Sequence, residues 1–336
     1  MQAALKLLAL PGEKGQRRQM WWLLGLLGVL FAFPFGAPPY IRSLMIEVLI
    51  FAVFAMSLDV LMGYTGLVSF GHAAYFGLGG YILGFTILNI TSNLFVILPL
   101  LIIGTSLIAF IIGFFALRTT GIYFLMLTLA FSQMFFGLAI KWTPVTGGSD
   151  GLAGLGRPYL GFGDLAFQFG RDNNFYYLVL VLFLFSWWFL TRLVNSPFGH
   201  TLKGIKENEA RMLALGYNTW NFKISAFVVA GVFAGIAGML LAAFNRHVAP
   251  ESLYWIVSGQ VIIMVLIGGM GSLSGPILGA ALVRLLPSYA SSYTERWQTI
   301  MGLVFISFVL FAPQGISGLA KKFRQRQGTN APRNEI

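Results

Sequence analysis

The sequence predicts an all-α fold: a polytopic membrane helical bundle of about ten spans, some of them short or broken, with both termini cytoplasmic. Of the 336 residues, 57% are hydrophobic and 10% are charged, and the mean hydropathy is +0.79. Because a soluble domain carries about 25% charged residues, this chain has too little polar surface to face water on all sides. Its 40 glycines fit a membrane bundle, in which small residues let helices approach closely.

Long apolar runs supply the predicted spans, since a helix needs roughly 20 apolar residues to cross the hydrocarbon core. Two runs near the C-terminal end are short and interrupted by Gly or Pro. The first run follows basic residues, as in a signal peptide, but no small-x-small cleavage site comes after it, so we expect it to be retained. The candidate spans are 20–36, 44–62, 67–88, 94–117, 121–140, 174–194, 223–244, 257–270, 273–287 and 298–312.

The distribution of Lys and Arg predicts the orientation of these spans. With the N-terminus inside and ten crossings, fifteen of the 22 Lys and Arg residues fall on the inner side and seven on the outer side. We therefore expect a cytoplasmic N-terminal segment 1–19, a transmembrane domain 20–318 and a basic cytoplasmic tail 319–336. The net charge of +11 then reflects membrane topology, and no nucleic-acid partner is expected.

Two connections between spans are long. Residues 141–173 are expected outside and contain a glycine-rich turn, whereas residues 195–222 are expected inside. In the inner connection, Pro197 offers a helix start and Gly216 a C-terminal cap. We predict one short amphipathic helix between them on the cytoplasmic face, with its charges grouped at 203–211, shaped to dock into a groove on a partner.

A glycine motif occurs twice in the chain, 205 residues apart. The predicted topology puts both copies on the cytoplasmic side in the same orientation. Since many transporters contain inverted repeats, either this repeat is parallel or the number of crossings near 257–287 is off by one. The two copies are Gly63-x-x-Gly66-x-x-Ser69 and Gly268-x-x-Gly271-x-x-Ser274.

The glycines of these copies allow two compatible interpretations. They permit close helix packing, and they permit unwound helices whose backbone lines a central cavity. Polar groups inside spans add to the second interpretation because they are costly in lipid and often functional. The resulting candidates for a translocation pathway or gate are Asp59, Gly66, Ser69, His72, Gly268, Gly271 and Ser274.

Asp59 and His72 flank the same tight turn, and we expect that they can pair. One interpretation makes them gate groups that respond to a transport cycle. The other makes them a buried pair that locks two helices together, and we favour this structural role.

We expect no catalytic activity from this chain. Without cysteine, disulfides, thiolate metal sites and cysteine nucleophiles are excluded. No G-x-x-x-x-G-K-[ST] phosphate loop is present, the three histidines are scattered, and no G-x-S-x-G serine has credible partners. We therefore predict no catalytic residue, no metal site and no cofactor.

Several segments together resemble the permease subunits of bacterial branched-chain amino acid ABC importers, and the LivM-like members in particular. They follow the family's order over most of residues 57–318. The segments are SLDVLMGYTGLVSFGHAAYFGLGGY (57–81), RTTGIYFLMLTLAFSQMFF (118–136), TGGSDGL (146–152), SPFGHTLKGIKENEARMLALGY (196–217), AFVVAGVFAGIAGMLLAAF (226–244), SGQVIIMVLIGGMGSLSGPILGAAL (258–282) and APQGISG (312–318).

The resemblance implies a heteromeric assembly in the bacterial inner membrane. This multi-pass chain would pair with a second, LivH-like permease subunit, two cytoplasmic ATP-binding subunits and a periplasmic solute-binding protein. Residues 204–216 would be the coupling segment that contacts an ATP-binding subunit. The coupling residues it nominates are Lys206, Glu207, Asn208, Glu209, Ala210, Arg211 and Gly216.

The expected function is uptake of branched-chain or other hydrophobic amino acids by alternating access, with the solute delivered near the loops 141–173 and 245–256. Similar family members carry urea or short-chain amides, so a urea or amide permease remains an alternative. An alternative from another class is an ion-coupled secondary transporter or channel, which would work without ATP.

Overall fold

The computed structural model describes residues 28–161, 167–170, 172–293, 296–311 and 315–318. These residues fall into two compact units that meet between Ser43 and Leu44. The predicted terminal segments 1–19 and 319–336, and the first part of the 20–36 run, lie outside the described residues.

In the first unit, residues 28–36 are helical, and a short turn leads into α3 (Pro39–Asp59). Arg42 closes this turn, because its Nη2 donates to the carbonyl oxygens of Pro34 at 2.9 Å and Ala37 at 3.0 Å. These bonds pair carbonyl groups that the end of the first helix leaves without a helical partner.

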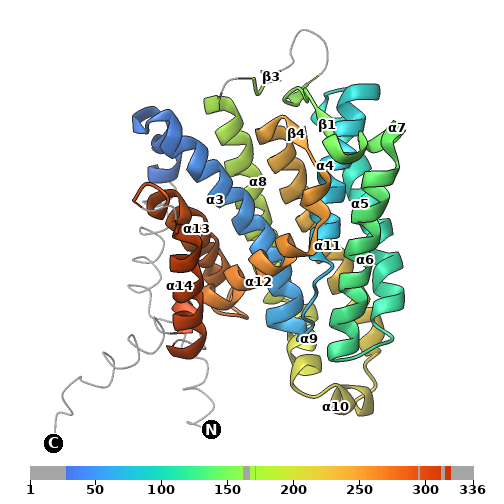
Figure 1. Cartoon of the computed structure of the whole chain (residues 1–336). Coiled ribbons are helices and arrows are strands. Elements are labelled where there is room, and N and C mark those ends of the chain that lie inside the picture. The colour runs from blue at the N-terminus through green and yellow to red at the C-terminus, as the bar shows by residue number, and fades with distance from the viewer. Residues whose placement is uncertain (1–27, 162–166, 171, 294–295, 312–314, 319–336) are drawn as a thin grey trace, which may run out of the picture. The chain divides into compact units, whose positions relative to one another are not determined.

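The second unit is almost entirely helical, and Figure 1 shows its elements. Four two-residue strands form two small antiparallel ladders, β1 with β4 and β2 with β3. After α3 the elements are η1 (Val60–Thr65), α4 (His72–Asn89), α5 (Leu94–Ala116), α6 (Ile122–Lys141), α7 (Thr143–Thr146), η2 (Gly148–Asp150), β1 (Leu152–Ala153), β2 (Tyr159–Leu160), β3 (Phe167–Gln168), α8 (Asp172–Val194), α9 (Pro197–Glu207), α10 (Glu209–Ala214), α11 (Thr219–Asn245), β4 (His247–Val248), η4 (Pro250–Leu253), α12 (Trp255–Gly268), α13 (Ser274–Ala290) and α14 (Trp297–Phe311).

Within the described part of the chain, five helices are long and apolar enough to cross a membrane. The fold is therefore an all-α polytopic bundle, while the count of about ten spans and the position of the termini stay predictions. The five are Pro39–Thr65, Leu94–Ala116, Ile122–Lys141, Asn173–Val194 and Thr219–Asn245.

The long helices differ in how deeply they are buried. The most apolar stretch of α3 is 89% buried and that of α11 is 72% buried, against 28% for α5 and 22% for α6. Large apolar side chains on α5, such as Ile103 and Leu107, are exposed. Helices α3 and α11 therefore form the centre of the unit, and α5 and α6 present the apolar surface that lipid requires.

Helices α4 and α11 approach closely because glycines lie at their contact. A Cβ on Gly238 would overlap the carbonyl of Phe76, and one on Gly79 would overlap the carbonyl of Gly235. Small residues of this kind let two backbones meet where lipid offers no hydrophobic driving force.

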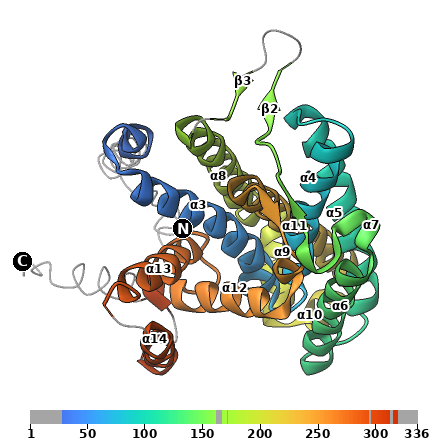
Figure 2. The same ribbon diagram turned by 45° about the horizontal axis from the view of Figure 1, so that its top comes forward.

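Two helices begin inside the bundle. The run 67–88 was a candidate span whose glycines also permitted an unwound stretch; residues 66–71 are not helical, and α4 begins at His72. Helix α12 likewise starts after a segment, residues 249–254, that is not α-helical and contains the 3-10 helix η4. The two starts meet, since the backbone N–H of Ala73 donates to Ser258 Oγ at 2.8 Å. Figure 2 shows α12, α13 and α14 gathered on one side of α3, with α5, α6 and α7 on the other.

The two ends of the second unit carry different elements. The β strands and α7 lie at the upper end in Figure 1, and α9 and α10 lie at the lower end. At the upper end the loops 141–173 and 245–256 are joined by the ladder of β1 with β4. His247 Nε2 also lies 2.9 Å from the carbonyl oxygen of Asp150.

Candidate functional site

The coupling segment is two helices rather than the single helix that the sequence predicted. Asn208 separates α9 from α10 with an extended backbone at φ −160° and ψ 98°. Its Oδ1 accepts a hydrogen bond of 2.9 Å from the N–H of Arg211. Asn is a strong N-cap residue, so Asn208 followed by Glu209 already contained the signal for a new helix start. Gly216, at φ +87°, ends the segment in the left-handed conformation, as predicted.

Lysines of α9 attach the segment to the end of α3. Lys206 Nζ donates to the carbonyl oxygen of Gly63 at 2.7 Å, and Lys203 Nζ lies 5.2 Å from the centre of the Tyr64 ring. Gly66 leaves room for this approach, since a Cβ there would be 3.2 Å from Lys206 Cγ. The segment therefore contacts the turn that the first glycine motif forms.

Helix α10 is attached to α11 through a carboxylate. Glu209 Oε2 lies 2.5 Å from Lys223 Nζ, and Glu209 Oε1 accepts a hydrogen bond of 2.9 Å from Thr219 Oγ1. The Lys223 side chain is 11% exposed and the Glu209 side chain 38%, so water screens the pair only in part. In contrast, Glu207, Ala210 and Arg211 are exposed, and no residue of α10 is buried.

The two glycine motifs meet at the end of α3. Asp59 is fully buried, and its Oδ1 accepts a hydrogen bond of 2.8 Å from the backbone N–H of Gly271. Gly63 lies against the same amide, and a Cβ on Gly63 would overlap both partners. The two copies of the motif therefore meet, although the bonded residues lie 212 positions apart.

The predicted pairing of Asp59 with His72 is wrong. His72 Nε2 is 2.8 Å from Ser57 Oγ, and the imidazole stacks on Phe54 with 5.4 Å between ring centres. Residues 57 and 59 point about 200° apart around a helix of 3.6 residues per turn. A histidine that contacts Ser57 therefore cannot also reach Asp59.

The other candidate residues of the motifs do not form one cluster. Ser69 is buried and its Oγ accepts from the N–H of Gly71 at 3.2 Å. Gly268 packs against the backbone of Gly275, and Ser274 is exposed at the start of α13. These residues shape the backbone on either side of the Asp59–Gly271 contact.

Hydroxyl groups that the sequence did not single out bond to the backbone of the broken segments. Thr128 Oγ1 accepts from the N–H of Phe70 at 3.2 Å, Ser132 Oγ donates to the carbonyl of Leu253 at 2.7 Å, and Ser258 receives the N–H of Ala73. Non-helical backbone at membrane depth needs such partners. Their only signal in the sequence is a small polar residue inside an apolar run.

Glu47 and Arg284 form an ion pair of 2.6 Å between α3 and α13. The guanidinium also lies over the ring of Phe51, 4.0 Å from its centre. The predicted topology puts both charges toward the outer end of their helices, and this contact agrees with that.

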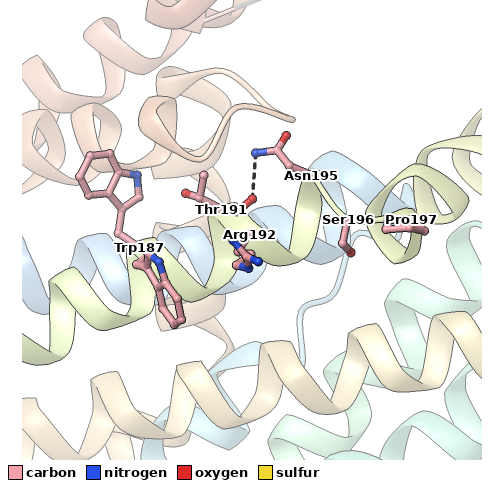
Figure 3. Close-up of a pocket in the computed structure, with 7 residues that line it drawn as sticks. Trp187, Thr191, Arg192, Asn195, Ser196 and Pro197 are labelled. Atoms are coloured by element: carbon pink, nitrogen blue, oxygen red, sulfur yellow. Dashed lines mark hydrogen bonds between the residues drawn. The ribbon is translucent and has the colours of Figure 1, made fainter. Parts of the chain in front are cut away.

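A cavity of about 680 Å³ lies where α8 ends and α9 begins. Figure 3 shows the residues that line it, among them Trp187, Arg192 and Asn195, whose Nδ2 donates to the carbonyl of Thr191 at 2.8 Å. Trp side chains with a neighbouring Arg are typical of the membrane–water boundary.

Comparison with known proteins gives this arrangement a family. The family model described as "Branched-chain amino acid transport system / permease component" matches residues 40–312. The chain belongs to this family. The match includes both glycine motifs and the coupling segment, so this member of the permease family carries its candidate site within the family's shared region.

Individual relatives carry the same description. The chain is 29% identical to the "High-affinity branched-chain amino acid transport system permease protein LivM" of Salmonella typhimurium over 91% of this chain and 77% of that protein. The LivM protein of Escherichia coli is likewise 29% identical over 91% and 77%. A "Probable branched-chain amino acid transport permease protein LivH" of Methanocaldococcus jannaschii is 22% identical over 81% of this chain and 90% of that protein. No solved structure matches the chain.

Proposed function

We propose that this chain is the LivM-like permease subunit of an ATP-driven importer that carries branched-chain amino acids across the bacterial inner membrane into the cytoplasm. The carrying observation is the hydrogen bond from Lys206 to the carbonyl of Gly63. It links an exposed, charged segment to the glycine turn inside the bundle. A permease driven from outside the membrane needs such a link, whereas a channel that works alone does not.

The proposed assembly contains a second, LivH-like permease subunit, two ATP-binding subunits and a periplasmic solute-binding protein. The LivM and LivH names of the relatives support a permease pair. One ATP-binding subunit would contact the exposed face of α10, which carries Ala210 and Arg211, and the exposed Glu207 at the end of α9. ATP hydrolysis then takes place on that subunit and not on this chain.

Alternating access follows from how the coupling segment is attached. Movement of the ATP-binding subunits would shift α9 and α10 together. Lys206 would carry the shift to the end of α3, and Glu209 would carry it to α11. From α3, the Asp59–Gly271 bond would pass it to the connection between α12 and α13. Small shifts of this kind can switch a packed interface between two discrete arrangements.

In the proposed topology the segment 195–222 is cytoplasmic and the loop 141–173 is periplasmic, within a permease domain of residues 20–318. The termini 1–19 and 319–336 are then cytoplasmic and the spans number about ten. The excess of Lys and Arg on the side of the coupling segment supports this orientation.

The test is uptake by the complete assembly in proteoliposomes. We expect ATP-dependent accumulation of labelled leucine that unlabelled isoleucine and valine inhibit and urea does not. Inhibition by urea with no effect of isoleucine would replace the proposed solute class. Accumulation of leucine without ATP would overturn the importer assignment and favour an ion-coupled carrier or channel.

A further inference from the structure

A second cavity, of about 250 Å³, lies against the segment 249–254, which contains the 3-10 helix η4 and leads into α12. Its walls come from α3, α4 and α11, the three helices that meet at the centre of the unit, and from β4 and the start of α12. It is thus bounded by one of the two backbone breaks, where a transporter can offer backbone groups to a solute.

One side of the cavity is polar. Glu251 and Gln260 line it, and both are exposed. Among the described residues, the Glu251 carboxylate has no ion pair and no side-chain hydrogen bond. The Glu251 carboxylate is therefore available to accept hydrogen bonds from a cationic group of a ligand.

Other residues that line the cavity are apolar. Phe51 and Phe76 line it with rings 5.9 Å apart, and both are almost fully buried. Val248 and Val257 complete this wall from β4 and α12. These four side chains offer aliphatic and aromatic carbon to a ligand.

The size of the cavity limits what can enter. A protein cavity of about 150 Å³ accommodates benzene. By the same proportion, about 250 Å³ holds roughly ten non-hydrogen atoms, which is the size of leucine or isoleucine. A dipeptide would not fit.

We infer that this cavity is a solute-binding subsite for a small zwitterionic amino acid with an aliphatic side chain. Glu251 holds the ammonium group, and Gln260 with the first turn of α12 receives the carboxylate, since a helix start favours negative charge. The side chain rests against Phe51 and Phe76. This inference rests on the proposed transport function and adds to it the place and chemistry of recognition.

The absence of cysteine from this chain makes a labelling test clean. The variant Ser252→Cys puts one thiol on the cavity wall, and Ser149→Cys puts one on the exposed loop near the same end as a matched control. Both are assembled with the partner subunits, reconstituted, and treated with a small water-soluble thiol reagent while leucine is titrated. Labelling of this chain is then followed on a gel.

We expect leucine at about ten times its half-protecting concentration to slow labelling of Ser252→Cys about tenfold and to leave Ser149→Cys unaffected. Glutamate should not protect. Adding Glu251→Gln should raise the half-protecting leucine concentration about tenfold or more, because a charge-assisted bond is lost. If Ser252→Cys fails to assemble, Gln260→Cys reports on the same cavity.

Uptake of labelled leucine by the same vesicles distinguishes failure of the subsite from failure of the proposed function. Leucine uptake without protection of Ser252→Cys or Gln260→Cys would overturn the subsite and leave the proposed function standing. Equal protection by glutamate and leucine would overturn the role of Glu251. Absence of ATP-dependent leucine uptake by the wild-type complex would overturn the proposed function itself.

Discussion

Lys206 Nζ donates a hydrogen bond of 2.7 Å to the carbonyl oxygen of Gly63, across 143 positions of sequence. The carbonyl belongs to the π-helical turn η1, where the wider winding leaves carbonyl groups without regular helical partners. The lysine therefore fills a gap in the backbone bonding of α3 with a side chain from the coupling segment. Five predictions follow from this and the neighbouring contacts, and each can be measured.

Replacing Lys206 by Met should uncouple the segment from the bundle. The variant loses a charge-assisted hydrogen bond. Because Lys206 is exposed, we expect this bond to contribute about 1.5 kcal/mol, near the lower end for hydrogen bonds to charged groups. We expect ATP-dependent uptake per inserted complex to fall about tenfold while the amount in the membrane is unchanged. Lys141→Met, at the opposite end, is the control and should keep wild-type uptake. Wild-type uptake by Lys206→Met would contradict the coupling role.

The ion pair of Glu209 with Lys223 should tolerate exchange of its charges better than loss of one. Glu209→Lys places a second ammonium group beside that of the buried Lys223. Repulsion between the two like charges should detach α10 from α11. The double variant Glu209→Lys/Lys223→Glu should recover most of the uptake. A double variant no better than Glu209→Lys would argue that Glu209 acts through another partner.

Glu207 should behave differently from Glu209, because its side chain is exposed. Glu207→Lys is expected to leave thermal stability of the chain in detergent unchanged. Binding to the ATP-binding subunit should weaken about tenfold or more, since reversed charge at an interface is costly. Titration of the purified ATP-binding subunit measures this. A loss of stability without a change in affinity would contradict the assignment of Glu207 to the outer face.

Gly63 should not accept a side chain. Gly63→Ala would force a Cβ into Asp59 and the amide of Gly271, and overpacking of this kind costs about 1–3 kcal/mol. We expect a lower midpoint of thermal unfolding, and size exclusion in detergent measures it. Gly137→Ala is the matched control, because nothing lies within 4 Å of its Cβ and Ala favours a helix interior by about 1 kcal/mol. Equal midpoints for both variants would contradict the close contact.

Glu47 and Arg284 should stabilise the fold more as a pair than the two side chains do separately. Glu47→Gln leaves a partly buried guanidinium without its carboxylate, which should destabilise the chain by about 1–3 kcal/mol. The exchange Glu47→Arg/Arg284→Glu should restore only part of this, because the guanidinium would no longer lie over Phe51. The unfolding midpoints of Glu47→Arg, Arg284→Glu and their combination give the coupling energy of the pair. Additive effects would show that the two residues act independently.

The sequence predicts the lipid-facing helices well and the broken ones poorly. The runs 94–117 and 121–140 match α5 and α6 within a residue or two, because a lipid-facing helix has to be apolar along its whole length. Residues 66–71 look equally apolar, yet their backbone is unwound. The N–H of Phe70 bonds to Thr128, 58 positions away, and no local sequence pattern contains that contact.

The candidate site was predictable where the signal is local. Gly216 was identified as a cap from its position, and Asn208 carried a recognisable N-cap signal that was overlooked. The partner of Asp59 could not be found this way, because adjacency along the chain suggested His72 and the actual partner is the amide of Gly271. Choosing between them requires the phase of α3 and the path of the chain 212 positions later.

The bond between Ala73 and Ser258 also sets a requirement on how the chain is made. Ser258 follows Ala73 by 185 residues, so at 5–20 residues per second the ribosome needs roughly 10–40 s to supply it. For that time the start of α4 has no acceptor for its amide, and residues 66–71 cannot rest in lipid with bare backbone. The start of α4 therefore gains this acceptor only after α12 has been made.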